Sequence, residues 1–84
     1  MNICKFILEV GERVKCLRVN QGYSQDEFST LVGWDKSYLC RVECGKQNLT
    51  LENIAKVCSA LKITPKDFFM PIDYQIEGRE NNNA

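Results

Sequence analysis

The chain of 84 residues lacks histidine, Cys-x-x-Cys pairs and any apolar run long enough to cross a membrane. Without histidine a mixed Cys/His zinc site is excluded, and no phosphate-binding loop, metal-ligand spacing or paired-acid motif indicates an enzyme. The five cysteines are Cys4, Cys16, Cys40, Cys44 and Cys58. Because their number is odd and no signal peptide is apparent, we expect free thiols in the cytoplasm, mostly as small core residues.

Net charge is also absent, since eleven Lys and Arg balance eleven Asp and Glu. This balance argues against a strongly basic nucleic-acid binder. The acidic residues are enriched near the end, however, and residues 1–71 carry ten Lys and Arg against eight Asp and Glu, a net of +2. A few well-placed cations are enough for a site-specific dimer, because phosphate contacts position it and base contacts give specificity.

Apolar residues recur at spacings of three and four, which predicts an all-α fold of about five helices. The first helix is expected over about residues 6–20. Its inner face is formed by Ile7, Val10, Val14 and Leu17. Gly11 within this helix costs about 1 kcal/mol relative to alanine, unless a neighbouring helix requires a close approach.

Two short helices joined by a glycine turn are predicted within Ser24–Gly45. Ser24 and Glu27 have the spacing of a capping box, and Gly33 ends the first of the two helices. The residues expected to face inward from it are Phe28, Leu31 and Val32. The second helix is expected within Asp35–Cys44, with Asp35 as its cap. Leu39 and Val42 form its inner face. This arrangement is a helix-turn-helix, whose second helix can enter the DNA major groove.

Threonine caps predict the last two helices. Thr50 precedes a helix whose core stripe is Leu51, Ile54, Val57, Cys58 and Leu61. Thr64 and Pro65 begin a short helix that runs to about Met70. We expect residues 1–76 to form one helix-turn-helix domain with a C-terminal dimerisation region, and residues 77–84 to be a disordered polar tail.

Short groups of residues match a known pattern in one register from about Val10 to Phe69. They include Gly22-Tyr23-Ser24-Gln25, Leu31-Val32-Gly33, Ser37-Tyr38-Leu39, Arg41-Val42-Glu43 and Leu51-Glu52-Asn53-Ile54. In these groups the chain resembles the phage-repressor/Cro (XRE-type) family of helix-turn-helix DNA-binding domains. Gln47-Asn48-Leu49-Thr50 and Phe68-Phe69 are further similar to controller proteins of restriction-modification systems. The resemblance implies a homodimer on a palindromic operator, with its two recognition helices about 34 Å apart.

The outward face of the second helix supplies the candidate base contacts, which are Lys36, Ser37, Cys40 and Arg41. Lys36 and Arg41 can donate to guanine O6 and N7, and a bidentate arginine contributes about 1–3 kcal/mol of discrimination. Cys40 is small enough to contact a thymine methyl group. The family usually has longer polar residues at Cys40 and Cys44, and a redox role for this pair is a further possibility. Alternatively, these side chains are simply solvated.

Candidate phosphate contacts surround this helix. They are Gln25, Tyr38, Lys46, Gln47 and Asn48. The resemblance assigns Gln25 to phosphate, and the unpaired N–H groups at that helix start favour an anion. The alternative is a polar loop with a half-buried Tyr38.

Two further groups have structural roles in this prediction. Arg18 and Glu43 match a family ion pair that orients the recognition helix, the alternative being two separate surface charges. The candidate dimer contacts are Phe68, Phe69, Met70, Ile72 and Tyr74. One phenylalanine is expected to fill the core, and the alternative is that all of these residues pack within the chain.

The sequence therefore predicts a transcription regulator that binds double-stranded DNA as a homodimer, without catalysis, cofactor, metal, small-molecule ligand or membrane contact. The competing hypothesis is a protein-interaction module, such as an antitoxin or a regulatory subunit, built on the same helical bundle.

Overall fold

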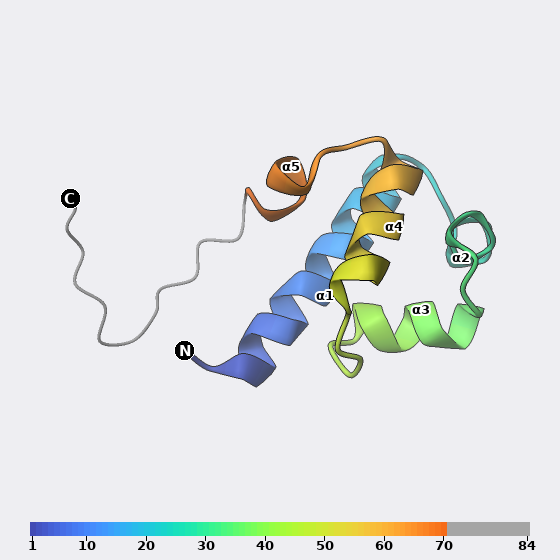
Figure 1. The fold of residues 1–84 in the computed structure, drawn as a ribbon. Coiled ribbons are helices and arrows are strands. Elements are labelled where there is room, and N and C mark those ends of the chain that lie inside the picture. The colour runs from blue at the N-terminus through green and yellow to red at the C-terminus, as the bar shows by residue number, and fades with distance from the viewer. Residues whose placement is uncertain (71–84) are drawn as a thin grey trace.

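A computed structural model describes residues 1–70 and contains five helices in them, which confirms the all-α fold. They are α1 (Ile3–Asn20), α2 (Gln25–Val32), α3 (Lys36–Glu43), α4 (Leu51–Leu61) and α5 (Pro65–Phe69). Figure 1 shows α1 and α4 next to each other, with α3 running across the lower edge of the molecule and α2 at its right-hand end. Ile72, Tyr74 and the predicted tail at residues 77–84 lie outside the described residues.

Side-chain caps define where most helices begin. Asn2 accepts a hydrogen bond from the Lys5 backbone N–H at 3.0 Å, so α1 begins at Ile3, three residues before the predicted start. The predicted capping box of α2 is present. The Glu27 N–H donates to Ser24 Oγ at 3.0 Å, and the Ser24 N–H donates to Glu27 Oε1 at 2.8 Å. Together these bonds satisfy N–H groups that have no partner within the helix.

The N-terminal caps of the remaining helices agree with the prediction, except at α3. Thr50 and Thr64 cap α4 and α5 through their hydroxyl oxygens. Asp35 precedes α3 as predicted, but its carboxylate makes no capping hydrogen bond. The prediction of a side-chain cap there was therefore wrong, and the start of α3 has no side-chain hydrogen bond at its N-cap.

The core lies where α1, α2, α3, α4 and α5 meet. Its fully buried side chains are Val14, Phe28, Leu39, Val42, Val57 and Phe68. Two residues expected to face the core do not, because Leu51 is 82% exposed and Leu31 is 49% exposed. Both have the correct helical spacing, but the packing of the helices leaves each of these two side chains largely on the surface.

The cysteines also differ from expectation. Only Cys58 is buried, whereas Cys4, Cys16, Cys40 and Cys44 are exposed. The four exposed thiols lie on the outer sides of α1 and α3, away from the stripes that face the core. Burial raises the pKa of the Cys58 thiol, which makes this cysteine less reactive.

Gly11 is buried where α1 crosses α3. A Cβ atom at this position would lie 2.0 Å from the carbonyl oxygen of Val42. The absence of a side chain thus permits the backbones of α1 and α3 to come into contact. This close approach explains the glycine within α1, and it sets the point along α1 at which α3 crosses it.

Side chains of α1 also hold the ends of the later helices. Arg13 Nε and Nη2 donate to the carbonyl oxygens of Phe68 and Asp67 at 2.8 and 2.9 Å. Gln21 Nε2 donates to the carbonyl oxygen of Leu61 at 3.0 Å. The last carbonyl groups of a helix lack partners within it, so these bonds satisfy α4 and α5 at their C-terminal ends.

Lys62 follows α4 in the left-handed conformation, with φ of 60°. A side chain in this region costs free energy that glycine does not incur. We expect Lys62→Gly to raise the free energy of unfolding by about 0.5–1 kcal/mol, which urea denaturation measures. Lys62→Ala removes the same charge but keeps the strain, and should give no gain. An equal gain in the free energy of unfolding from both variants would show that the effect comes from removing the Lys62 charge.

Within residues 1–70, no helix is long and apolar enough to span a membrane. The same residues include no cluster of three or more His, Cys, Asp and Glu side chains suited to a metal ion.

Candidate nucleic-acid interface

The turn between α2 and α3 sets the direction of the second helix. Gly33 adopts φ of 88°, in the left-handed region that glycine enters without strain, and its N–H donates to the Ser29 carbonyl at 2.9 Å. The N–H of Trp34 reaches the same carbonyl at 2.8 Å. The chain therefore leaves α2 abruptly, and α3 begins only three residues after Gly33.

The core fixes α3 from its inner side. Leu39 and Val42 are 0% and 1% exposed, as predicted. One face of an eight-residue helix is thereby buried against α1 and α2, and the opposite face remains open to solvent.

A buried polar network joins α3 to α1 and α2. Arg18 Nε and Nη2 donate to the two carboxylate oxygens of Glu43 at 2.7 and 3.1 Å, a bidentate pair. These side chains are only 9% and 3% exposed. Arg18 Nη1 also donates to the Tyr23 carbonyl at 2.8 Å, and Gln25 Nε2 donates to Glu43 Oε1 at 3.0 Å. One carboxylate thus receives donors from both flanking helices.

The candidate base contacts lie on the open face of α3, where all four are exposed. Lys36 Nζ lies 3.4 Å from Asp26 Oδ1 on α2, in a pair that solvent surrounds. Such an exposed pair contributes at most about 1 kcal/mol, so Lys36 can exchange it for a base or a phosphate. Arg41 extends towards the following loop.

Aromatic residues surround the start of α3. The rings of Trp34 and Tyr38 meet edge to face, with centroids 4.8 Å apart. The Arg41 guanidinium lies over the Tyr38 ring, 5.7 Å from its centroid. Asn53 Nδ2 on α4 donates to the Tyr38 hydroxyl at 2.9 Å. Tyr38 is therefore half-buried but held in one orientation, with its hydroxyl at the first turn of α4.

The loop after α3 contains the other candidate phosphate contacts. Lys46 and Asn48 are exposed, and Gln47 is partly buried. Arg41 Nε donates to Gln47 Oε1 at 3.3 Å, which connects the open face of α3 to this loop. The structure thus brings Arg41 together with two of the predicted phosphate residues, Tyr38 and Gln47.

Cys40 and Cys44 are both exposed, one helical turn apart. Neither thiol is part of the core, so both are available to a groove or to a reagent. A thymine methyl contact and a redox role therefore both remain predictions for this pair.

The predicted dimer residues divide into buried and exposed members. Phe68 is fully buried and packs edge to face on Phe69, with centroids 4.9 Å apart. Phe69 is partly buried, and Met70 is 63% exposed. An apolar pocket of 290 Å³ lies beside Phe69. Its other apolar side chains are Phe6, Ile7, Val10, Val42, Leu49, Leu51 and Ile54.

Sequence reasoning missed three residues that contact the candidate site residues. Trp34 supports the ring of Tyr38, Asn53 binds its hydroxyl, and Asp26 pairs with Lys36. The signal for Trp34 was local, because it is an aromatic residue directly after the turn glycine, Gly33. The contact of Asn53 had no local signal, because it joins residues 15 positions apart on different helices.

Comparison with known proteins identifies the family. The helix-turn-helix family designated HTH_3 matches residues 14–68. The control protein C.MunI of Mycoplasma sp. is 31% identical over 67 residues, which cover 79% of this chain and 90% of that protein. The Neisseria hypothetical transcription factor of Neisseria meningitidis serogroup B is 34% identical over 58 residues, and the match spans 69% of this chain but only 55% of that protein.

A solved structure agrees with these matches. The restriction-modification controller protein C.AhdI of Aeromonas hydrophila has a TM-score of 0.73 and 38% identity, covering 77% of this chain and 98% of that chain. C.Esp1396I bound to a 19-base-pair DNA duplex has a TM-score of 0.71 at 22% identity, covering 77% of this chain and 87% of that chain, a likeness of fold. The chain belongs to the helix-turn-helix family of DNA-binding transcription regulators.

Proposed function

We propose that this protein is a non-catalytic regulator that acts in the cytoplasm as a homodimer on a palindromic or near-palindromic operator. The observation that carries the proposal is the geometry of α3, whose inner face is buried while its outer face presents two cations and two small side chains. The similarity of the chain to C.MunI and C.AhdI favours an operator within a restriction-modification system.

Each group of side chains has a separate task in this proposal. Lys36, Ser37, Cys40 and Arg41 contact base edges in the major groove. Tyr38, Lys46, Gln47 and Asn48 contact the phosphates that flank it. Gln25 uses one amide N–H for Glu43, and its second N–H joins the backbone N–H groups at the start of α2 at another phosphate. The Arg18–Glu43 pair keeps α3 at the angle that these contacts require.

Phe69 and Met70, with Ile72 and Tyr74, form the contact between the two copies. Phe68 is fully buried in its own chain and contributes by supporting Phe69. The apolar pocket beside Phe69 gives this contact a concave surface. The same pocket is the observation that favours the second candidate function, a module that binds another protein.

Selection of duplexes from a random pool, followed by binding at several salt concentrations, tests the function. We expect a palindromic site, two chains per duplex, and an affinity that falls steeply as salt rises. Failure to enrich any duplex, together with retention of a protein partner at the apolar pocket, would favour the interaction module instead.

Arg41→Ala tests the proposed base contact within that experiment. We expect the affinity for the selected duplex to fall by about 1–3 kcal/mol, with a much smaller change on a random duplex. Lys15→Ala removes a cation from the exposed side of α1 and is the matched control, for which both affinities should change little. An equal loss on both duplexes would make Arg41 a phosphate contact.

A further inference from the structure

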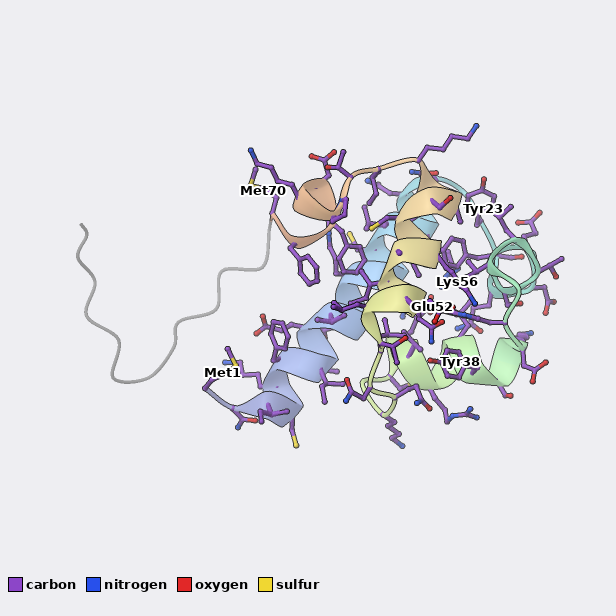
Figure 2. All side chains as sticks on the ribbon, viewed as in Figure 1. Met1, Tyr23, Tyr38, Glu52, Lys56 and Met70 are labelled. Carbon is purple, nitrogen blue, oxygen red and sulfur yellow. The ribbon has the colours of Figure 1, made fainter. Side chains whose placement is uncertain are left out.

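The bond between Asn53 and Tyr38 has a defined direction. Asn53 is in the first turn of α4, where its backbone N–H donates to Thr50 Oγ1 at 3.1 Å. Its side-chain Nδ2 donates to the Tyr38 hydroxyl oxygen at 2.9 Å. Figure 2 labels Tyr38 on α3 and, on α4, Glu52, which precedes Asn53 in the sequence. Asn53 is thus held by one hydrogen bond from its backbone and one from its side chain.

The direction of this bond determines where the tyrosine proton goes. A tyrosine hydroxyl has one proton to donate and lone pairs that accept, whereas an amide NH₂ group only donates. Asn53 Nδ2 therefore occupies a lone pair and cannot receive the Tyr38 proton. The ring itself is held by the edge of Trp34 and by the Arg41 guanidinium above it. With the ring fixed and one side of the oxygen occupied, the proton is directed away from α4.

We propose that Asn53 is a positioning residue, which turns the hydroxyl proton of Tyr38 towards a phosphate oxygen of bound DNA. The inference rests on the phosphate contact of Tyr38 proposed above. A hydrogen bond from a hydroxyl to an anionic oxygen is short and about twice as strong as a neutral one. Donation from Asn53 into the same oxygen polarises the hydroxyl and strengthens its own donation. Asn53 therefore acts on DNA affinity through Tyr38.

Asn53→Asp reverses this bond while keeping the size of the side chain. The carboxylate only accepts, so the Tyr38 hydroxyl donates its hydrogen bond to it, and the lone pairs of the hydroxyl oxygen then face the phosphate. An acidic residue in the first turn of a helix is favourable, so the fold is retained, and thermal unfolding verifies this. The new negative charge also repels DNA. For this reason the test uses four proteins: the wild type, Asn53→Asp, Tyr38→Phe and the double variant.

Their affinities are measured on the palindromic duplex obtained by selection. Tyr38→Phe should weaken binding about tenfold, the value of one hydrogen bond to a charged group. Asn53→Asp should weaken it about tenfold more in the wild-type background than in the Tyr38→Phe background. Charge repulsion is present in both backgrounds, whereas only the wild type has a proton to redirect.

The two proposals fail in different ways. If Tyr38→Phe weakens binding but Asn53→Asp has the same effect in both backgrounds, Tyr38 contacts DNA and the positioning role of Asn53 is overturned. If Tyr38→Phe has no effect, the phosphate contact is overturned and the positioning role with it.

A second measurement distinguishes positioning from a general structural effect. Duplexes that carry a single neutral methylphosphonate are compared with the unmodified duplex for each protein. We expect one phosphate whose neutralisation weakens the wild type but not Tyr38→Phe, and Asn53→Asp should be equally insensitive there. A loss spread evenly over all phosphates for Asn53→Asp would overturn the proposal.

Discussion

Glu43→Ala is expected to lower the free energy of unfolding by about 3–5 kcal/mol, because it leaves the buried Arg18 guanidinium without its carboxylate. Both side chains are more than 90% buried, and the carboxylate receives donors from Arg18 and Gln25. An uncompensated charge in this position cannot be solvated without separating α1 from α3. Urea denaturation monitored by circular dichroism measures the loss.

The matched control removes another glutamate of an ion pair. Glu52 is 81% exposed and pairs with Lys56 at 4.0 Å, so Glu52→Ala should change stability by less than about 0.5 kcal/mol. The double variant Arg18→Met/Glu43→Leu removes both charges and should recover most of the loss. A single Glu43→Ala variant as stable as the Glu52→Ala control would contradict this account of the network.

Gly11→Ala is expected to lower the free energy of unfolding by at least about 2 kcal/mol, although alanine is favoured over glycine in a helix by about 1 kcal/mol. The added Cβ would lie 2.0 Å from the Val42 carbonyl oxygen. Because that atom belongs to the backbone of α3, relief requires the two helices to move apart. Denaturation gives the loss in stability, and binding to the selected duplex should weaken because α3 is displaced.

Glu12→Ala is the control for helix propensity, since Glu12 is the next residue of α1 and is exposed. This variant should remain within about 0.5 kcal/mol of the wild type. A gain in stability for Gly11→Ala would show that α1 and α3 separate at little cost.

Most features that depend on neighbours in sequence could be predicted, the side-chain cap expected from Asp35 being an exception. The capping box of Ser24 and Glu27 involves residues three apart. Gly33 adopts the left-handed conformation that glycine favours over other residues. The inward direction of Leu39 and Val42 follows from the helical period. These local signals were sufficient to locate the two helices of the motif and the outer face of α3.

Features that depend on distant elements could not be predicted. Leu51 has the spacing of a core residue, but whether it is buried depends on which element lies over the first turn of α4. The exposed cysteines are a similar case, because free cysteine is usually buried, and which thiols are covered depends on how the helices pack. The bond between Asn53 and Tyr38 arises only when α3 and α4 are packed together.

The division of α3 into a buried and an open face has a consequence for how such a protein diversifies. Leu39, Val42 and Glu43 maintain the fold, whereas Lys36, Ser37, Cys40 and Arg41 contribute nothing to the core. Mutation can therefore replace the second set without a large loss of stability. Under the proposed function, a few surface substitutions would therefore change the operator preference, and a duplicated gene could acquire a new one while the scaffold stays intact.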